Sequence, residues 1–250
     1  MIYHATRNGS TRAMLAMVFG LMACLFTMPA AVAMDPQQPF HSYVLDHWSV
    51  EQGLPQITVL DMTEDRAGFL WVNTQAAVAR FDGARFVTYG RAATGVDTSM
   101  LAVAWADPQG GVWFGGAHGL LHERDGRFTS LGGSAVNAII DAGDGMPLLA
   151  TADGLKRVRD GRIVALGGYV GPAFSLLRDG KTLWIGGIGR ICRRDDGVQP
   201  VCIQASQAQQ QRMVVRHLAR QGDQVWLGTQ LGLMRVDGDH LVPAGVGDEL

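Results

Sequence analysis

Short apolar runs alternate with turn dipeptides along the chain, at spacings too short for helices. Between residues 100 and 131, Asp107-Pro108-Gln109-Gly110 and Asp125-Gly126 separate such runs. Asp-Gly suits the positive φ values of a tight hairpin, and Asp-Pro-Gln-Gly suits a four-residue turn. The pattern therefore predicts four antiparallel strands, near Met100–Trp105, Gly111–Gly115, Leu120–Glu123 and Arg127–Ser130.

The same pattern occurs five times. Each copy has an aromatic or aliphatic run, and an Asp-Gly turn follows the first residue of that run by 11 or 12 positions. Four short strands in about 40 residues, repeated, are typical of β-propeller blades. We therefore expect an all-β propeller of four-stranded blades, with about five blades present. The runs begin at Trp71, Trp113, Leu148, Trp184 and Trp226, in copies near residues 57–90, 100–131, 135–167, 173–203 and 213–245.

The recurrent tryptophan is expected to pack between neighbouring blades. Leu148 replaces it in the third copy. A ligand contact would less readily become leucine, so we interpret this position as framework.

Composition agrees with a β-rich protein and excludes one class of partner. Gly accounts for 33 of 250 residues, and only 18% of residues are charged. The formal net charge of −2 offers no basic field to attract nucleic acid.

Residues 1–33 have the pattern of a secretory signal peptide. Arg7 and Arg12 precede an apolar run from Met14 to Met28, and Ala31-Val32-Ala33 offers small residues to a signal peptidase. Two alternatives stay open: an uncleaved anchor, although the run is short for a spanning helix, and a lipoprotein site at Cys24. We expect an exported, periplasmic protein.

Two cysteines, Cys192 and Cys202, lie beyond the signal peptide and flank Asp195-Asp196-Gly197. If this turn joins two antiparallel strands, the cysteines lie opposite each other and can form a disulfide in an oxidising compartment. The alternative, two unbridged small apolar residues, stays open.

The first copy carries the motifs of a known family. On these motifs, residues 40–250 resemble the two-component regulator propeller, most clearly in the first copy. Asn73 and Ala77 depart from the pattern, since the family usually has glycine at both positions, and we expect those loops to be locally altered. The motifs are Gly53-Leu54-Pro55, the Asp-x-x-Gly-x-x-Trp string of Asp65 to Trp71, and Arg80-Phe81-Asp82-Gly83.

The resemblance implies a sensor function. Such propellers form the periplasmic ligand-sensing region of histidine kinases, hybrid sensors and GGDEF-type diguanylate cyclases, and they usually have seven blades. The five copies here, an apolar segment at Phe40–Trp48 without a partner strand, and a trailing Gly247-Asp248-Glu249-Leu250 predict an incomplete part of such a ring. We expect an output domain and an inner-membrane anchor in a missing C-terminal region of the full-length protein.

Few residues have the pattern of a catalytic or metal site. His118 and His122 flank a loop and a strand and do not share a helix face, so their spacing does not predict a metal site. Paired carboxylates such as Asp195 and Asp196 lie at turns. We expect no metal, no cofactor and no catalytic residue in this chain.

Ligand contacts are expected around the channel mouth. In a propeller, the loops between second and third strands share one face, and innermost strands line the channel. We therefore expect contacts from Gln75, His118, Arg190 and Gln230 on such loops and from Trp105 on an innermost strand.

The predicted function is an extracytoplasmic ligand-sensing module. A carbohydrate fragment is the ligand class implied by the resemblance alone. One alternative is an exported propeller enzyme, a glycosidase or lyase, which would need carboxylates converging on the channel. Another is a scaffold for protein contacts.

Overall fold

The computed structural model of the chain describes residues 46–244. The chain divides into two units, Met1–His47 and Trp48–Leu250, and the elements given below belong to the second. The predicted signal peptide, Cys24 and the trailing Gly247–Leu250 lie outside the described residues. Most of the predicted strand Phe40–Trp48 also lies outside them, and its last three residues are not in a strand.

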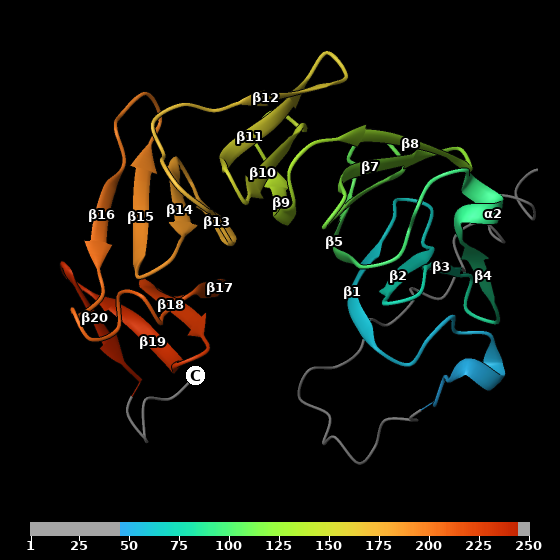
Figure 1. Cartoon of the computed structure of the whole chain (residues 1–250), viewed down its shortest axis with the longest axis horizontal. Coiled ribbons are helices and arrows are strands. Elements are labelled where there is room, and N and C mark those ends of the chain that lie inside the picture. The colour runs from blue at the N-terminus through green and yellow to red at the C-terminus, as the bar shows by residue number, and fades with distance from the viewer. Residues whose placement is uncertain (1–45, 245–250) are drawn as a thin grey trace, which may run out of the picture. The chain divides into compact units, whose positions relative to one another are not determined.

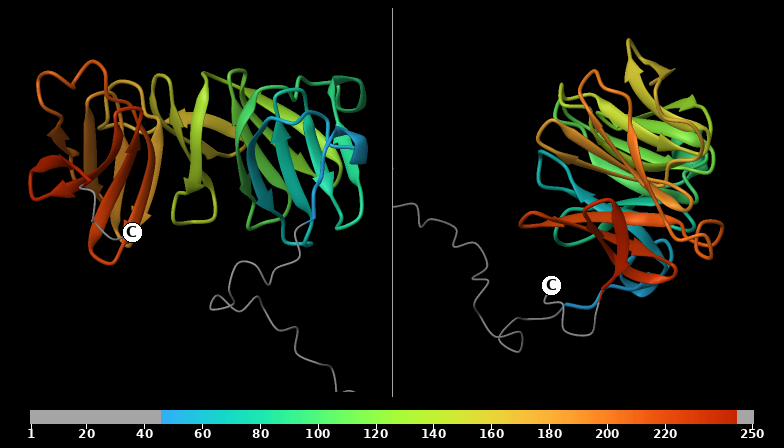
Figure 2. Two further views of the ribbon diagram at one scale, coloured as in Figure 1. Left: turned by 90° about the horizontal axis from the view of Figure 1, so that it is seen from below. Right: turned by 90° about the vertical axis from the view of Figure 1, so that its left-hand side faces the viewer.

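Five antiparallel sheets of four consecutive strands make up the second unit (Figure 1). Each sheet is a twisted ribbon (Figure 2), as expected from the right-handed twist of strands. This confirms the all-β propeller of four-stranded blades. That further blades complete the ring stays a prediction.

The predicted strands of the second copy agree with the structure to within one or two residues. The elements outside the blades are the 3-10 helix η2 (Val50–Gln52) and the short helix α2 (Arg91–Thr94). Blade 1 contains β1 (Val59–Glu64), β2 (Leu70–Thr74), β3 (Val78–Phe81) and β4 (Phe86–Tyr89); blade 2 contains β5 (Leu101–Ala106), β6 (Val112–Gly116), β7 (Gly119–Arg124) and β8 (Arg127–Gly132). Blade 3 contains β9 (Val136–Asp141), β10 (Pro147–Thr151), β11 (Gly154–Arg159) and β12 (Arg162–Ala165). Blade 4 contains β13 (Ser175–Asp179), β14 (Thr182–Gly186), β15 (Arg190–Asp195) and β16 (Val201–Gln204); blade 5 contains β17 (Val215–Gln221), β18 (Gln224–Thr229), β19 (Gly232–Asp237) and β20 (His240–Pro243).

Consecutive blades pack through their first strands. Strand β1 contacts β5, β5 contacts β9, β9 contacts β13 and β13 contacts β17, so these five are the innermost strands. The apolar cores lie between blades and not within one sheet. One core contains Trp71 of blade 1 with Phe114 of blade 2, and another contains Trp184 of blade 4 with Val215 of blade 5.

The repeat position predicted as framework is buried in every blade. Trp71 and Leu148 are each 1% exposed, and the tryptophans of the other three blades are 5–8% exposed. Burial of a side chain of this size stabilises the fold by about 2–3 kcal/mol. The residues are Trp71, Trp113, Leu148, Trp184 and Trp226.

The Asp-x-x-Gly-x-x-Trp motif is explained by one carboxylate. Asp65 Oδ1 accepts hydrogen bonds from the backbone N–H groups of Ala67 and Phe69, which closes the β1–β2 turn. Its Oδ2 accepts the indole N–H of Trp71 at 2.7 Å. Blade 2 repeats the arrangement with Asp107 and Trp113, at 3.0 Å. The motif therefore couples a turn to the packing of the blade interface.

Candidate functional site: the central cavity

Four of the five innermost strands share an irregularity that the apolar pattern did not predict. In β1, the pairing with β2 skips one residue between Val59 and Asp61. Strands β5, β9 and β17 have the same interruption at the equivalent position. Such β-bulges leave a residue outside the ladder, re-aim its side chain, and are over-represented beside active sites. The bulged residues are Leu60, Ala102, Asn137 and Arg216.

All four bulged residues line one cavity of about 270 Å³, to which every blade contributes from its innermost strand. Its apolar wall comes mainly from alanine, valine, leucine and isoleucine side chains. Its polar groups come from blades 1, 3, 4 and 5. They are Asp61, Asn137, Ser175, Arg216 and His217.

Three of the polar groups join neighbouring blades. Asp61 Oδ2 accepts the N–H of Ala104 in blade 2 at 2.7 Å. Asn137 donates through Nδ2 to the carbonyl of Ala173 at 2.8 Å, and Ser175 donates to the carbonyl of Val215 at 2.8 Å. These bonds fix the spacing of the innermost strands and so the width of the cavity.

The other two polar groups are available to a ligand. Arg216 and His217 are exposed, and within residues 46–244 neither side chain has a hydrogen bond or ion pair. A cation and an imidazole above an apolar wall suit a small polar molecule that also offers an apolar face.

Asn73 shows why glycine is usual at its position. In blade 2 the equivalent residue is Gly115, where an added Cβ would lie 2.6 Å from Cγ1 of Val136 on the next blade. Asn73 is fully buried opposite Asp61, and within the described residues neither its Oδ1 nor its Nδ2 has a hydrogen-bond partner. The replacement of the family's usual glycine by Asn73 therefore places a buried, unpaired amide behind the cavity wall.

The loop residues predicted as ligand contacts do not line the central cavity, and two of them hold neighbouring segments together. Gln230 Oε1 accepts the N–H of Val214 at 2.9 Å, and its Nε2 donates to the carbonyl of Arg212. Gln75 is exposed and receives a hydrogen bond from Gln56. Their contribution to ligand binding stays a prediction.

His118 and Trp105 lie in different surroundings. His118 is exposed in the β6–β7 loop. Its charge contributes a little to the lowered pKa of Asp97, which is caused mainly by hydrogen bonds from Ser99. Trp105 packs, partly buried, against the apolar core between blades 2 and 3, and it is not part of the cavity wall.

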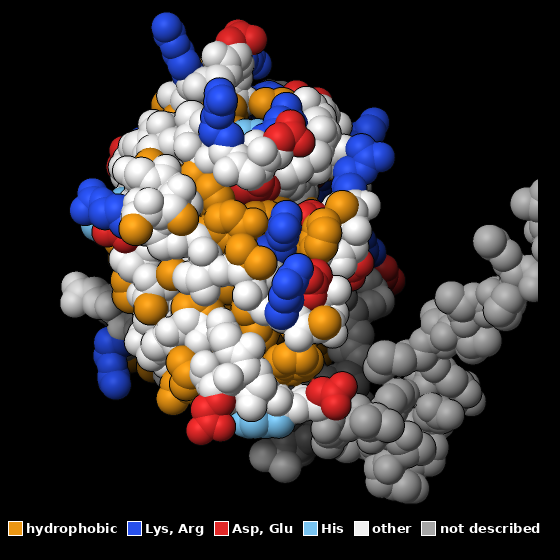
Figure 3. Space-filling view, turned by 90° about the vertical axis from the view of Figure 1, so that its right-hand side faces the viewer, with side chains coloured by type: hydrophobic (Ala, Val, Ile, Leu, Met, Phe, Trp, Pro, Cys, Tyr) orange, Lys and Arg blue, Asp and Glu red, His pale blue; other side chains and the backbone are white. Residues whose placement is uncertain are grey.

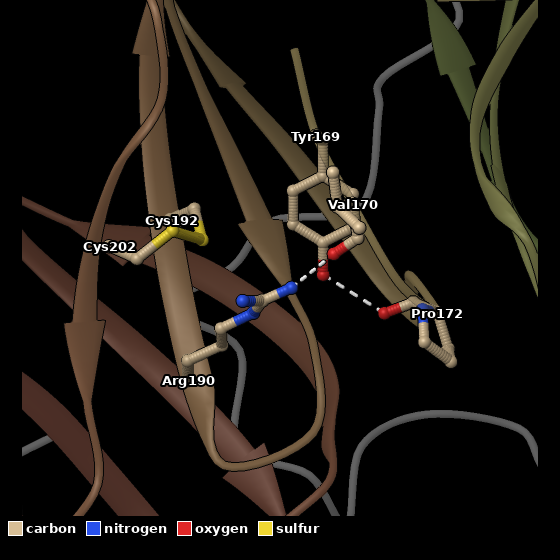
Figure 4. Close-up of a disulfide and its surroundings, with 6 residues drawn as sticks. All are labelled: Tyr169, Val170, Pro172, Arg190, Cys192 and Cys202. Atoms are coloured by element: carbon tan, nitrogen blue, oxygen red, sulfur yellow. Dashed lines mark hydrogen bonds between the residues drawn. A yellow bond between two sulfur atoms is a disulfide. The ribbon is translucent and has the colours of Figure 1, made fainter. Parts of the chain in front are cut away.

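Arg190 holds the linker between blades 3 and 4 (Figure 4). Its guanidinium donates to the carbonyl of Val170, and its Cζ lies 5.2 Å from the ring centroid of Tyr169. The Tyr169 hydroxyl donates to the carbonyl of Pro172 at 2.9 Å, and burial raises its pKa. The charge of Arg190 thus has local structural partners in this linker.

Cys192 and Cys202 face each other on β15 and β16 and are joined by a disulfide of 2.03 Å (Figure 4). Cys192 is fully buried in the core between blades 3 and 4. The bridge ties the outer strand of blade 4 to that core.

Within the described part of the chain, no group of three or more His, Cys, Asp or Glu side chains is arranged to hold a metal ion. His122, which the sequence pairs with His118, is stacked on Trp113 with ring centroids 3.8 Å apart. In residues 46–244, no helix is long and apolar enough to cross a membrane.

The face drawn in Figure 3 has acidic and basic side chains interspersed among exposed apolar ones. Neither sign of charge forms a continuous field on it, in keeping with the small net charge of −2. This face therefore lacks the basic surface typical of nucleic-acid binding.

No protein-family model matches the chain, and no curated protein sequence matches it. Solved structures do match. The extracellular domain of BT3049 from B. thetaiotaomicron, described as a hybrid two-component system, is 19% identical with a TM-score of 0.63, over 77% of this chain and 30% of that one. The extracellular domain of BT4673, described as a one-component system of the same organism, is 18% identical with a TM-score of 0.50, over 73% and 32%. Virginiamycin B lyase from Staphylococcus aureus is 14% identical with a TM-score of 0.57, over 78% and 72%.

These likenesses show the fold. The chain is similar in fold to extracellular domains of bacterial two-component and one-component systems, and this confirms the propeller that the sequence resemblance implied. It spans about a third of the length of those two structures.

Proposed function

We propose that this chain is an extracytoplasmic, ligand-recognising propeller module of a bacterial signal-transduction protein, and that a small polar molecule binds in its central cavity. A kinase or diguanylate cyclase output domain would lie elsewhere in the full-length protein. A carbohydrate fragment is the ligand class we would test first.

One observation carries the proposal. The bulged residues of four blades meet at a single cavity, and all five innermost strands contribute to its wall. Regular ladder pairing would make the side chains point alternately to the two faces of each strand. The bulges re-aim one side chain per strand, and equivalent bulges that converge on one space suit a binding site. The exposed Arg216 and His217 supply the polar contacts.

A periplasmic location is part of the proposal. The signal-peptide pattern of residues 1–33 and the Cys192–Cys202 bridge both suit an oxidising compartment. The two B. thetaiotaomicron structures are titled extracellular domains, which supports the same location by analogy.

An enzyme is the second candidate, favoured by the fold likeness to virginiamycin B lyase. Glycoside hydrolysis usually requires two carboxyl groups on either side of the substrate. Among the described residues that line the central cavity, Asp61 supplies the one carboxylate, and it already accepts the N–H groups of Met62 and Ala104. The lining therefore favours binding over hydrolysis.

The experiment is a thermal-shift screen of the purified chain with mono- and disaccharides. We expect at least one sugar to raise the Tm, since a ligand that binds only the folded state stabilises it. Ala102→Trp places an indole at an exposed position of the cavity wall and should abolish the shift. Ala84→Trp, in the exposed β3–β4 turn, is the matched control and should keep it.

Two results would contradict the proposal. One is a shift of equal size in Ala102→Trp and the wild type, because the ligand would then bind elsewhere. The other is chemical conversion of the bound sugar, which would favour the enzyme.

A further inference from the structure

A second cavity lies between blades 3 and 4, on the face that carries the β9–β10 and β15–β16 turns. Its volume is about 140 Å³. Apolar side chains form its floor, and three arginines from three different strands surround it. The lining residues are Ala142, Leu148, Arg157, Leu166, Arg178, Leu183, Arg194, Asp196 and Gly197.

This cavity lies where the repeat loses its tryptophan. Leu148 occupies the position of Trp71 and Trp113, and it pairs across the sheet with Arg157. In blade 1 the paired cation, Arg80, lies 5.8 Å from the indole of Trp71. Trp71 and Arg80 also line a cavity at the equivalent place, between blades 1 and 2. What Leu148 changes is the partner of the cation: a leucine is smaller than an indole and offers no ring face to Arg157.

Arg157 has an unused donor. One of its terminal nitrogens, Nη2, lies 2.6 Å from Oδ2 of Asp144. Its Nε is buried, and within residues 46–244 it has no hydrogen-bond partner. A buried charged donor without a partner is costly, so a movement of the Arg157 side chain that gives Nε an acceptor would be favoured.

The other two arginines are positioned without being neutralised. Arg178 donates to the backbone carbonyls of Asp141 and Ala142, at 3.3 and 2.9 Å. Arg194 donates to the carbonyl of Gly167 at 2.9 Å. In the described part of the chain, no carboxylate forms an ion pair with either. Carbonyl groups orient a guanidinium but leave its full charge in place.

Cations therefore exceed carboxylates around this cavity. Asp144 neutralises Arg157, and Asp196 is exposed on the β15–β16 turn. One positive charge remains uncompensated above a floor of leucines. Low local polarity strengthens attraction to an anion, and planar guanidinium groups match the geometry of a carboxylate or sulfate.

We propose that this cavity binds the oxyanion group of a small ligand, either a free inorganic anion or the carboxylate of an acidic sugar. The site is separate from the central cavity and does not depend on its function. Arg157, Arg178 and Arg194 contact the anion, and Leu148 forms part of the apolar floor beneath it.

The test is isothermal titration of the full chain with sulfate, glucuronate and glucose at low ionic strength. We expect sulfate or glucuronate to bind, and glucose, which lacks the charge, not to. Arg178→Gln and Arg157→Gln should each weaken binding by about tenfold or more. Leu148→Trp keeps all three arginines but fills the space, and it should abolish binding. Arg162→Gln, an exposed arginine outside the lining, is the matched control and should bind as the wild type does.

The possible results distinguish the two sources of the anion and show whether the proposed site exists. Binding of sulfate alone supports the site with a free oxyanion as its ligand, and binding of glucuronate that sulfate displaces supports an acidic sugar. The proposal is overturned if neither anion binds, if glucose binds equally well, if Leu148→Trp retains affinity, or if Arg162→Gln loses as much affinity as the other variants.

Discussion

Blades 2 and 3 carry different residues at the framework position of the repeat, and the difference shows what surrounds that position when the indole is absent. In blade 2, Trp113 donates its indole N–H to Asp107 and stacks on His122. In blade 3 the same position is Leu148, and its cross-strand partner Arg157 borders a cavity of about 140 Å³. Equivalent strands thus carry a buried, hydrogen-bonded indole in one blade and a leucine beside a cavity bordered by arginines in the next.

The comparison teaches where to look for function in a repeat protein. The tryptophan recurs in four of the five blades and is buried in each, and in blades 1 and 2 an aspartate accepts its indole N–H. Two positions that depart from the repeat lie beside or carry buried polar groups without a partner among the described residues, Arg157 Nε beside Leu148 and the amide of Asn73, and the indoles of Trp184 and Trp226 are unpaired as well.

Transferring the blade 3 residue into blade 2 should be the most damaging change. Trp113→Leu removes a buried ring, leaves Asp107 with one donor fewer and opens a cavity beside His122. We expect a loss of about 2–4 kcal/mol in the free energy of unfolding, below the 3–5 kcal/mol typical of truncation to alanine. Urea denaturation measures it. A loss below about 1 kcal/mol would show that Trp113 is not packed in blade 2 in the way described.

Removing the carboxylate that anchors the indole should cost somewhat less. Asp107 is 4% exposed and receives hydrogen bonds from Trp113, Gln109 and Arg124. Asp107→Ala leaves these donors unpaired, and we expect a loss of about 2–3 kcal/mol. The exposed Asp223 is the matched control, and Asp223→Ala should leave urea stability unchanged. Equal effects of the two substitutions would refute the anchor.

The disulfide stabilises the wall of the blade 3–4 interface. Cys192 and Cys202 are separated by 10 residues, and closing a loop of that size contributes about 2–3 kcal/mol. We expect the double variant Cys192→Ser/Cys202→Ser to have a lower Tm than the oxidised wild type and the same Tm as the reduced wild type. Mass spectrometry of protein isolated from the periplasm checks the bridge itself, and finding both thiols free would contradict it.

The smallest expected effect is on the pH dependence of stability, to which a histidine of blade 2 should contribute. Burial holds the pKa of His122 below its usual value near 6.5, with Asp107 opposing the shift and Arg124 adding to it. The unfolded state therefore binds the proton more readily, and stability should fall as the pH drops through 6.5 and level off below the folded pKa. His122→Phe should remove this slope; blade 3 has an arginine, Arg157, at the equivalent position.

A second group must be separated from this pH effect. Burial raises the pKa of Glu123 above its usual value near 4.5, so its contribution to stability falls as the pH rises from 4.5 towards the folded pKa. Its slope is opposite in sign to that of His122. Because Glu123 is present in both proteins, the difference between wild type and His122→Phe isolates the histidine. No difference between pH 5 and 7 would contradict the assignment.

The architecture was predictable because its determinants are local. Asp125-Gly126 fixes a hairpin through its own backbone, where both residues have positive φ. The Asp-x-x-Gly-x-x-Trp motif that begins at Asp65 fixes a turn through one side chain. Strands bounded by such turns can be placed from sequence, as β6 shows, predicted at Gly111–Gly115 and found at Val112–Gly116.

The candidate site was less predictable because it depends on pairing between strands. The bulge at Asn137 arises from its register against β10, which the apolar pattern of β9 does not contain. A bulge also shifts, by one residue, the alternation of side chains between the two faces of a strand. The face of β5 on which Trp105 lies therefore cannot be inferred from its position in the sequence. Leu148 was visible as a departure from the repeat, but the arginines around it come from β11, β13 and β15 and meet only in the fold.

Blade 3 keeps the four-stranded framework of the other blades and has space beside Leu148 for a larger side chain. Urea denaturation of Leu148→Trp in buffer free of multivalent anions tests this most directly. We expect a free energy of unfolding within about 1 kcal/mol of the wild type or above it, since the indole enters existing space. A loss of about 3 kcal/mol or more, the cost of a badly overpacked core, would contradict it.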